Sequence, residues 1–243
     1  MKSVPTDTFG LNLPLLVLAS LAAAILSAAN PAVAQSSRER LSMDYGWRFH
    51  LGNAADTAGD FGYGGGRAFA KTGPSRRGMN PMSPAFDDSN WRLIDVPHDW
   101  AVELEFDPQA DRSHGFKAIR RQLPANSVGW YRKTFDLPAS DQGKRLAVEF
   151  DGVFRDSMAW LNGHLLGRNL SGYSSFRYDI SDVANYGGEN TLVIRVDASI
   201  FEGWFYEGAG IYRHTWLVKT APVHVGHWGT FVSATVNEDG ASA

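Results

Sequence analysis

From about Ser36 onward, the chain is a series of short stretches in which apolar and polar residues alternate. Leu146, Val148 and Phe150 occupy every second position of one stretch, and residues 192–197 repeat this pattern. A period of two is typical of strands with one buried face, and no apolar 3.6-residue repeat of helical length follows residue 36. Residues 130–136 and 211–218 are rich in aromatic and β-branched side chains, which favour strands. We therefore predict an all-β fold, an antiparallel β-sandwich of jelly-roll type.

Turn-forming residues mark the connections between these strands. Asn162-Gly163 separates residues 158–161 from residues 164–166, and this dipeptide suits the two positive φ angles of a type I′ hairpin. Residues 60–84 are dense in glycine and proline. No Gly-Lys-Ser/Thr follows them, and no strand-to-helix context exists for a phosphate-binding loop, so we predict a long surface loop.

The first 34 residues differ from the rest. Lys2 precedes an apolar run over residues 11–29, and Ala32-Val33-Ala34 stands before Gln35. A charged start, an apolar stretch and a small-x-small end predict a secretory signal peptide that is cleaved after Ala34. An uncleaved membrane anchor is the alternative, because the run is nearly long enough to span a bilayer. We expect a secreted or periplasmic protein.

Composition excludes several classes of function. The net charge is −3, which gives no support to nucleic-acid binding or, after signal cleavage, to membrane binding. The chain has no cysteine, so disulfides, thiolate metal sites and a cysteine nucleophile are all excluded. The histidines near the C-terminus lack the helical spacing of a zinc hydrolase, and we predict no metal site.

Several sequence blocks, in order and separated by strand-length gaps, resemble glycoside hydrolase family 2, particularly its β-galactosidases. The blocks are Asp44-Tyr45-Gly46-Trp47-Arg48-Phe49, Phe86-Asp87-Asp88-Ser89-Asn90-Trp91, Val96-Pro97-His98-Asp99-Trp100, Gly129-Trp130-Tyr131-Arg132-Lys133-Thr134-Phe135, Phe150-Asp151-Gly152-Val153, Trp160-Leu161-Asn162-Gly163-His164, residues 173–180, Gly188-Glu189-Asn190 and Trp204-Phe205-Tyr206-Glu207-Gly208-Ala209-Gly210-Ile211-Tyr212-Arg213. The resemblance covers about residues 40–236.

The resemblance implies three domains: a galactose-binding-like jelly roll, an immunoglobulin-like domain and a catalytic (β/α)8 barrel. We expect residues 35–221 to form the first of these, and residues 222–243 to begin a truncated immunoglobulin-like domain with one strand over residues 223–236. Family members cleave terminal β-linked sugars with retention, using two glutamates on the barrel. A barrel takes on the order of 250 residues, so we expect neither glutamate in this chain and predict the segment alone to be inactive. The expected partners are a β-linked oligosaccharide or glycoconjugate and the missing barrel.

The loop over residues 198–210 carries the first candidate site. In the family, an acidic residue just before this loop's tryptophan reaches the barrel's sugar site, where it contacts hydroxyls or a cation. Glu202 and Trp204 match those positions, with glutamate where the best-known members have aspartate. We predict no cofactor for this chain, and a cation near Glu202 only in a full-length enzyme. The alternative is an acidic loop residue beside packing aromatics.

His98 and Asp99 form the second candidate site, either lining the same cleft or serving the turn after Pro97. Three carboxylate pairs are candidates for an independent active site, namely Asp87 with Asp88, Glu103 with Glu105, and Glu202 with Glu207. A turn explains the first pair better and a solvated face explains the second, so we expect no independent active site in this domain. A stand-alone carbohydrate-binding module, a structural domain without sugar contact, and a β-glucuronidase- or β-mannosidase-type member of the family stay as alternatives.

Overall fold

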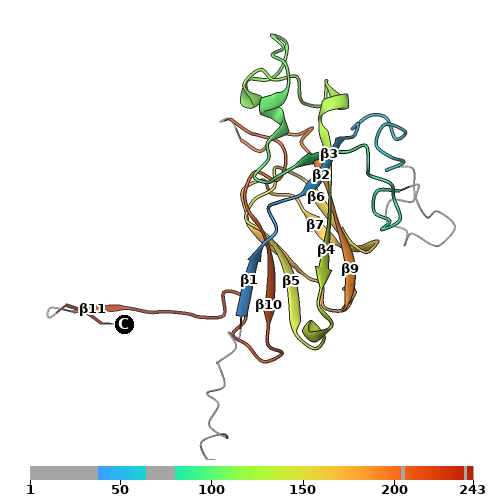
Figure 1. The fold of residues 1–243 in the computed structure, drawn as a ribbon. Coiled ribbons are helices and arrows are strands. Elements are labelled where there is room, and N and C mark those ends of the chain that lie inside the picture. Colours follow the sequence, from blue (N-terminus) through green and yellow to red (C-terminus); the bar gives the residue numbers. More distant parts are fainter. Residues whose placement is uncertain (1–37, 64–79, 204–205, 238–239, 243) are drawn as a thin grey trace, which may run out of the picture. The chain divides into compact units, whose positions relative to one another are not determined.

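The computed structural model describes residues 38–63, 80–203, 206–237 and 240–242. Within these ranges the chain forms an antiparallel β-sandwich (Figure 1). The first sheet has the order β1-β10-β5-β8, with strands β1 (Arg38–Ser42), β10 (Thr215–Thr220), β5 (Arg145–Phe150) and β8 (Phe176–Asp179). The second has the order β3-β2-β4-β9-β6-β7, with strands β3 (Arg92–Ile94), β2 (Trp47–Leu51), β4 (Val128–Leu137), β9 (Gly188–Asp197), β6 (Ser157–Leu161) and β7 (His164–Asn169). The predicted all-β sandwich is confirmed.

The predicted hairpin is present between β6 and β7. Asn162 has a φ angle of 52° and Gly163 one of 82°, as a type I′ turn requires. Asn162 also donates from its side-chain amide to Asn190 Oδ1 at 2.9 Å. The hairpin is thereby tied to β9, the strand beside β6.

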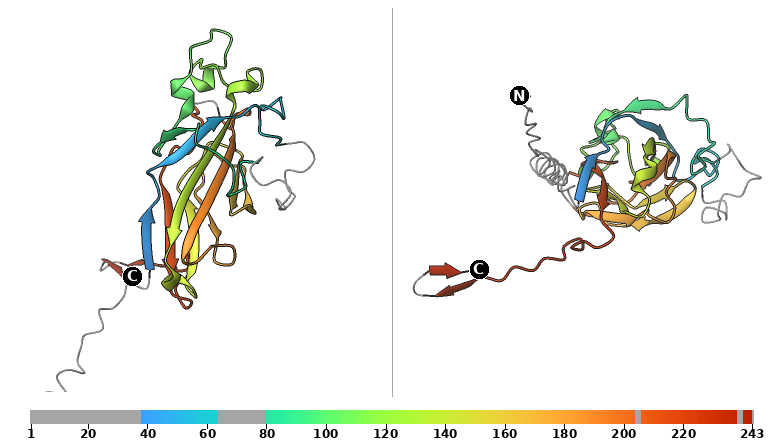
Figure 2. Two further views of the ribbon diagram at one scale, coloured as in Figure 1. Left: turned by 45° about the vertical axis from the view of Figure 1, so that its right-hand side comes forward. Right: turned by 60° about the horizontal axis from the view of Figure 1, so that its bottom comes forward.

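A hydrophobic core fills the space between the two sheets. The right-hand view of Figure 2 shows the strands of the sandwich from near one end. Inward-facing side chains come from both sheets, since strands alternate their faces. Those on the six-stranded sheet include Tyr131, Leu192 and Ile194, and those on the other include Val148 and Phe150.

The outer face of the six-stranded sheet is buried as well, which the alternating pattern did not predict. A second cluster forms there from the residues that point away from the first core; it comprises Met82, Trp91, Val128, Trp130, Met158, Trp160 and Val193. The segments on either side of residues 64–79 cover this face. Asp60 and Phe61 belong to the predicted surface loop, yet Asp60 is only 2% exposed. This loop is therefore a packed layer at its described ends.

Two buried arginines hold that layer to the sheet. Arg132 on β4 donates to Asp88 Oδ2 at 2.7 Å and to the carbonyl oxygens of Pro81 and Ser83. Arg195 on β9 donates twice to Asp60 Oδ2, at 2.7 and 2.9 Å. Such charge-assisted, two-pronged contacts are stronger than neutral hydrogen bonds. They fix residues 60–63 and 80–91 over the sheet.

The prediction of one strand over residues 223–236 is wrong. Residues 223–234 have no regular structure, and β11 (Thr235–Asn237) pairs only with β12 (Gly240–Ser242) in a two-stranded sheet. A strand needs a neighbour to satisfy its backbone groups. Among the described residues, no strand pairs with residues 223–234.

The connections at one end of the sandwich are long and carry most of the 3-10 turns. This end, called the loop end below, contains residues 97–127, 152–156, 170–174 and 198–214. The 3-10 turns there are η2 (Trp100–Glu103), η3 (Arg112–His114) and η4 (Pro124–Asn126), whereas η5 (Ala139–Asp141) lies between β4 and β5. In Figure 1 the segment with η2 to η4, in green, projects beyond the ends of β2 and β3.

Candidate functional site

Asp99 connects two loops at the loop end. Its Oδ1 accepts hydrogen bonds from the backbone amides of Ala101, at 2.9 Å, and Ala209, at 2.7 Å. Its Oδ2 accepts from the Tyr206 hydroxyl at 3.1 Å. The first contact caps η2, and the others hold the loop over residues 198–210. Asp99 thus makes the local contacts that turn aspartates commonly make.

His98 lies under this connection and is only 8% exposed. Arg92 Nη2 is 2.8 Å from His98 Nε2, and the Tyr131 hydroxyl is 2.8 Å from Nδ1. Glu103 Oε1 lies 3.2 Å from the same Nε2, so this nitrogen faces both a guanidinium, which only donates, and a carboxylate, which only accepts. Burial lowers the pKa of His98, which favours the neutral ring. The structure places His98 in a buried network with aromatic neighbours.

Glu202 points toward the loop over residues 170–174. Its Oε1 accepts from the Ser171 hydroxyl at 3.1 Å, and Oε2 accepts from the Gly172 amide at 2.6 Å. Arg155 Nε lies 3.7 Å from Oε2 and donates from Nη1 to the Phe201 carbonyl at 2.6 Å. The carboxylate is 29% exposed, so it stays open to solvent on one side. Trp204, its predicted partner, lies outside the described residues.

Glu207 is the residue that shapes this loop, and it is fully buried. Its Oε1 accepts hydrogen bonds from the backbone amides of Glu202, at 2.7 Å, and Gly203. Its Oε2 lies 3.7 Å from Arg120 Nη2. Arg120 also donates from Nε to His114 Nδ1 at 3.0 Å. A buried ion pair therefore sits beneath the backbone that carries Glu202.

His114 is enclosed completely in this cluster. Burial, with a further contribution from the neighbouring Arg120 charge, lowers the pKa of His114 to about 4. Asp111 and Ser113 complete the cluster by accepting from Arg120 Nη2. The lowered pKa keeps the imidazole of His114 neutral. A neutral imidazole has one ring nitrogen that can accept the hydrogen bond from Arg120.

Two glycines allow the loop to approach its neighbours closely. A Cβ on Gly208 would lie 2.3 Å from Asp99 Oδ2. Gly210 has a φ angle of +121°, and a Cβ there would lie 2.2 Å from the Tyr131 hydroxyl. Sequence reasoning considered Glu207 only as one of a catalytic pair, and it missed Arg120 and His114. The glycines beside Glu207 are the local signal for a tightly packed turn.

Aromatic and aliphatic side chains are exposed on the same loops. They are Phe106, Phe116, Ile200, Phe201 and Tyr206. Two of them contact cationic groups, because Arg120 lies over the Phe201 ring at 4.6 Å and Lys117 over the Phe106 ring at 4.0 Å. Flat apolar rings beside a carboxylate are suited to a ligand with both polar edges and apolar faces.

Five of the six carboxylates in the three pairs are engaged in other contacts, and Glu105 is exposed. Asp88 pairs with the buried Arg132, and Asp87 accepts from the Ser89 amide at 3.0 Å. Glu103 pairs with Arg92 at 2.7 Å.

Among the described residues, no group of three or more histidine or acidic side chains is placed to hold a metal ion. None of the helices in those ranges has the length and apolar character needed to cross a membrane.

Comparison with known proteins agrees with this architecture. A family model described as glycosyl hydrolase 2 galactose-binding domain-like matches residues 86–229. The chain belongs to this family, so the resemblance noted in the sequence is confirmed.

Individual relatives share the family and the fold. The chain is 38% identical over 201 residues to the β-galactosidase BoGH2A of Bacteroides ovatus, a match over 82% of the chain and 20% of the relative. It is 30% identical over 153 residues to a β-glucuronidase of Formosa agariphila, over 58% and 15% of the two chains. A glycosyl hydrolase family 2 member from Bacteroides cellulosilyticus superposes with a TM-score of 0.62 and 32% identity, over 81% of this chain and 22% of that one. The chain thus spans about a fifth of the length of these relatives, or less.

Proposed function

We propose that the chain is the N-terminal sugar-binding part of a secreted β-galactosidase-type hydrolase, and that its loop end forms one wall of the sugar site. The observation that carries this proposal is the support of Glu202 by Glu207, whose buried carboxylate holds two successive amides of the loop. A carboxylate fixed in this way accepts hydrogen bonds from sugar hydroxyls, while the exposed rings nearby pack against the apolar face of a sugar. His98 and Asp99 contribute by positioning this loop.

The chain by itself is proposed to be inactive. Retaining hydrolysis requires a general acid and a nucleophilic carboxylate about 5 to 5.5 Å apart. Five of the carboxylates considered above contact arginines, backbone amides or hydroxyls, and Glu105 is exposed. Glu207, one of the five, is buried. Incubation of the purified chain with a chromogenic β-galactoside is therefore expected to give no hydrolysis above the buffer rate. Turnover that follows the chain through purification would refute this part of the proposal.

The role of Glu202 is testable in the whole enzyme that contains this chain. Glu202→Gln removes the charge but keeps the shape, and we expect it to raise KM for a β-galactoside about tenfold, or about 1.4 kcal/mol. Glu189→Gln is the matched control, because Glu189 is exposed on β9 and is expected to leave KM unchanged. An unaltered KM in Glu202→Gln would assign the residue to loop structure alone.

A β-glucuronidase is the second candidate, since relatives of both activities match the chain. Comparing a β-galactoside with a β-glucuronide as substrate of the whole enzyme separates the two.

A stand-alone module would instead bind sugar tightly without a barrel, which titration calorimetry on the chain tests. The secretory signal predicts that the exported protein begins at Gln35, as N-terminal sequencing of that protein would show. No resident cofactor is proposed.

A further inference from the structure

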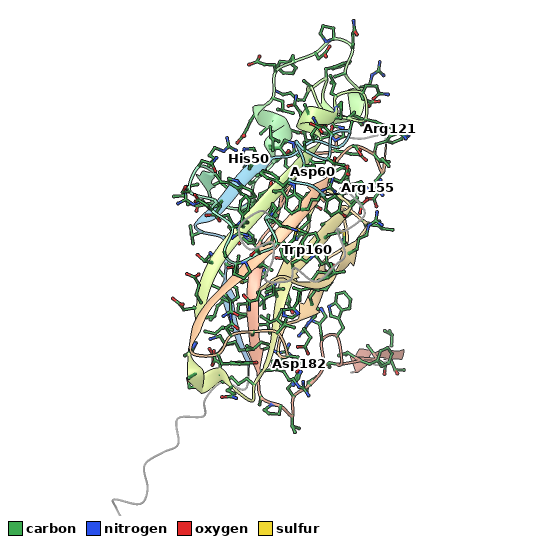
Figure 3. All side chains as sticks on the ribbon, turned by 90° about the vertical axis from the view of Figure 1, so that its right-hand side faces the viewer. His50, Asp60, Arg121, Arg155, Trp160 and Asp182 are labelled. Carbon is green, nitrogen blue, oxygen red and sulfur yellow. The ribbon has the colours of Figure 1, made fainter. Side chains whose placement is uncertain are left out.

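A second concave site lies where β6 begins and β9 ends, on the outer face of the six-stranded sheet. It is a cavity of about 300 Å³ bordered by residues 53–55, Thr57, Tyr63 and Met158, at the lower end of the range for small-molecule sites. Figure 3 shows Asp60, which lines it, in the same region of the sandwich as Arg155. Glu202, His98, Asp99 and the exposed rings named for the sugar wall do not line this cavity.

The polar groups of this cavity are held in fixed orientations. Asp60 and Arg195 form the buried floor and are paired at 2.7 Å, with the Tyr63 ring 4.0 Å from the guanidinium of Arg195. Asp156 and Arg168 form a two-pronged pair at the rim, at 2.6 and 2.7 Å. Side chains that are already ordered lose little conformational freedom when a ligand binds.

Two side chains on the rim retain polar atoms that can form hydrogen bonds with a ligand. Arg168 uses Nε and Nη2 for its pair with Asp156, which leaves Nη1 as a donor. Asp197 accepts from the Ser199 amide through Oδ1 at 3.0 Å, while Oδ2 has only long contacts of 3.4 Å with Arg195. The two residues that carry this donor and this acceptor both line the cavity.

The charge of the lining narrows the class of ligand. Three carboxylates and two guanidinium groups line the cavity, namely Asp60, Asp156, Asp197, Arg168 and Arg195. The formal charge is therefore −1, and both guanidinium groups are paired, which disfavours phosphate, sulfate or a uronate. The acidic residues form no group placed to hold a metal ion, within the ranges that the structure describes. A neutral ligand with several hydroxyls matches such alternating donors and acceptors best.

We propose that this cavity is an accessory binding site for a neutral sugar unit, separate from the sugar wall at the loop end. The two sites are neighbours, because Asp197 donates from its amide to the carbonyl of Arg155, the residue that contacts the Glu202 loop. One residue of the loop end, Asp156, also lines the cavity. The accessory site holds its ligand whether or not the loop end takes part in catalysis.

The test uses two-dimensional NMR of the nitrogen-15-labelled chain. The indole N–H of Trp130 donates to Asp60 Oδ1 at 2.6 Å, so its resonance reports on the cavity floor, and the Gly172 amide reports on Glu202 at the loop end. Lactose and cellobiose are the neutral probes, and methyl β-glucuronide and inorganic phosphate are the anionic ones. We expect at least one neutral disaccharide to shift the Trp130 resonance saturably without moving Gly172, and to bind more tightly than either anion.

Variants locate the binding. Arg168→Ala removes an exposed rim group and is expected to weaken binding of the neutral disaccharide at least tenfold. Arg177→Ala is the matched control, since Arg177 pairs with Glu149 at 3.3 Å on the other sheet, and it is expected to stay within twofold of the unmodified chain. The proposal is overturned by the absence of a saturable Trp130 shift with both disaccharides, by tighter binding of an anion, or by unchanged affinity in Arg168→Ala. None of these outcomes bears on the KM effect of Glu202→Gln.

Discussion

Acid is expected to destabilise this domain through His114, the neutral imidazole buried beneath the Glu202 loop. Burial and the Arg120 charge lower the pKa of His114 from 6.5 to about 4. The unfolded chain therefore binds a proton at a higher pH than the folded chain does. Stability from this group is complete above pH 6.5 and is lost as the pH falls from 6.5 toward 4.

The loss of folding free energy on acidification follows from the difference between the two pKa values of His114, 6.5 and about 4. At about 1.4 kcal/mol per pH unit, the full loss is about 3 kcal/mol, and the part lost between pH 7.5 and pH 5 is about 2 kcal/mol. His114 is 0% exposed, so solvent does not screen the charge that protonation would create. Burial of His98 also lowers the pKa of that ring, so it adds to the slope in the same direction and must be separated experimentally.

The variant His114→Asn separates the two histidines, because asparagine keeps an acceptor for Arg120 but does not titrate in this range. Guanidinium chloride unfolding, followed by tryptophan fluorescence at pH 7.5 and pH 5, measures the free energy of unfolding for each protein. We expect acidification to cost the unmodified chain about 2 kcal/mol more than it costs His114→Asn. His164→Asn, on the β6–β7 hairpin, is the control and should follow the unmodified chain. If the free energy of unfolding falls equally in His114→Asn and in the unmodified chain between pH 7.5 and pH 5, burial does not lower the pKa of His114.

Two further substitutions test how the loops are held. Asp60→Ala removes the nearest carboxylate of the buried Arg195 and leaves only the 3.4 Å contacts with Asp197. We expect a loss of about 3 to 5 kcal/mol in denaturant unfolding; a loss below 1 kcal/mol would contradict the pairing. Gly210→Ala forces a side chain into a positive φ and toward the Tyr131 hydroxyl, with an expected loss of at least about 2 kcal/mol. Gly46→Ala, with a φ of +74° and nothing within 4 Å of a Cβ, should lose only about 1 kcal/mol by the same measurement; equal losses would remove the steric argument.

The strands were predictable because their signal is local. The β6–β7 hairpin follows from Asn162-Gly163, and β4 and β9 follow from their alternating residues. Burial of the second face was not predictable, since Arg195 belongs in an outer cluster only because Asp60, 135 residues away, neutralises it. A charged residue in an alternating pattern normally indicates a position exposed to solvent. It can be buried when a residue far away in the sequence neutralises its charge.

The failed strand prediction has the same physical origin. Residues 223–236 contain apolar side chains at strand-like spacing, yet Val223, Phe231 and Val232 are exposed. Apolar composition favours a strand only where a second strand offers its edge and a second surface covers its side chains. Both conditions depend on residues far away in the sequence, so a short stretch of sequence does not reveal them. The loop-end cluster was missed for the same reason, because Arg120 and Glu207 meet only after the chain has passed through six further strands.

The sequence blocks that carry the family resemblance are largely each other's partners in the folded domain. Asp88 from one block binds Arg132 from another, and Asn162 binds Asn190. His98 contacts Tyr131 in the same way. These contacts join strands and loops of the sandwich, so the blocks identify the fold and say little about which sugar is bound. Under the function proposed above, we expect sugar preference to depend on residues outside the blocks or on block residues that face solvent, and Glu202 at the loop end and the Arg168 rim meet that condition.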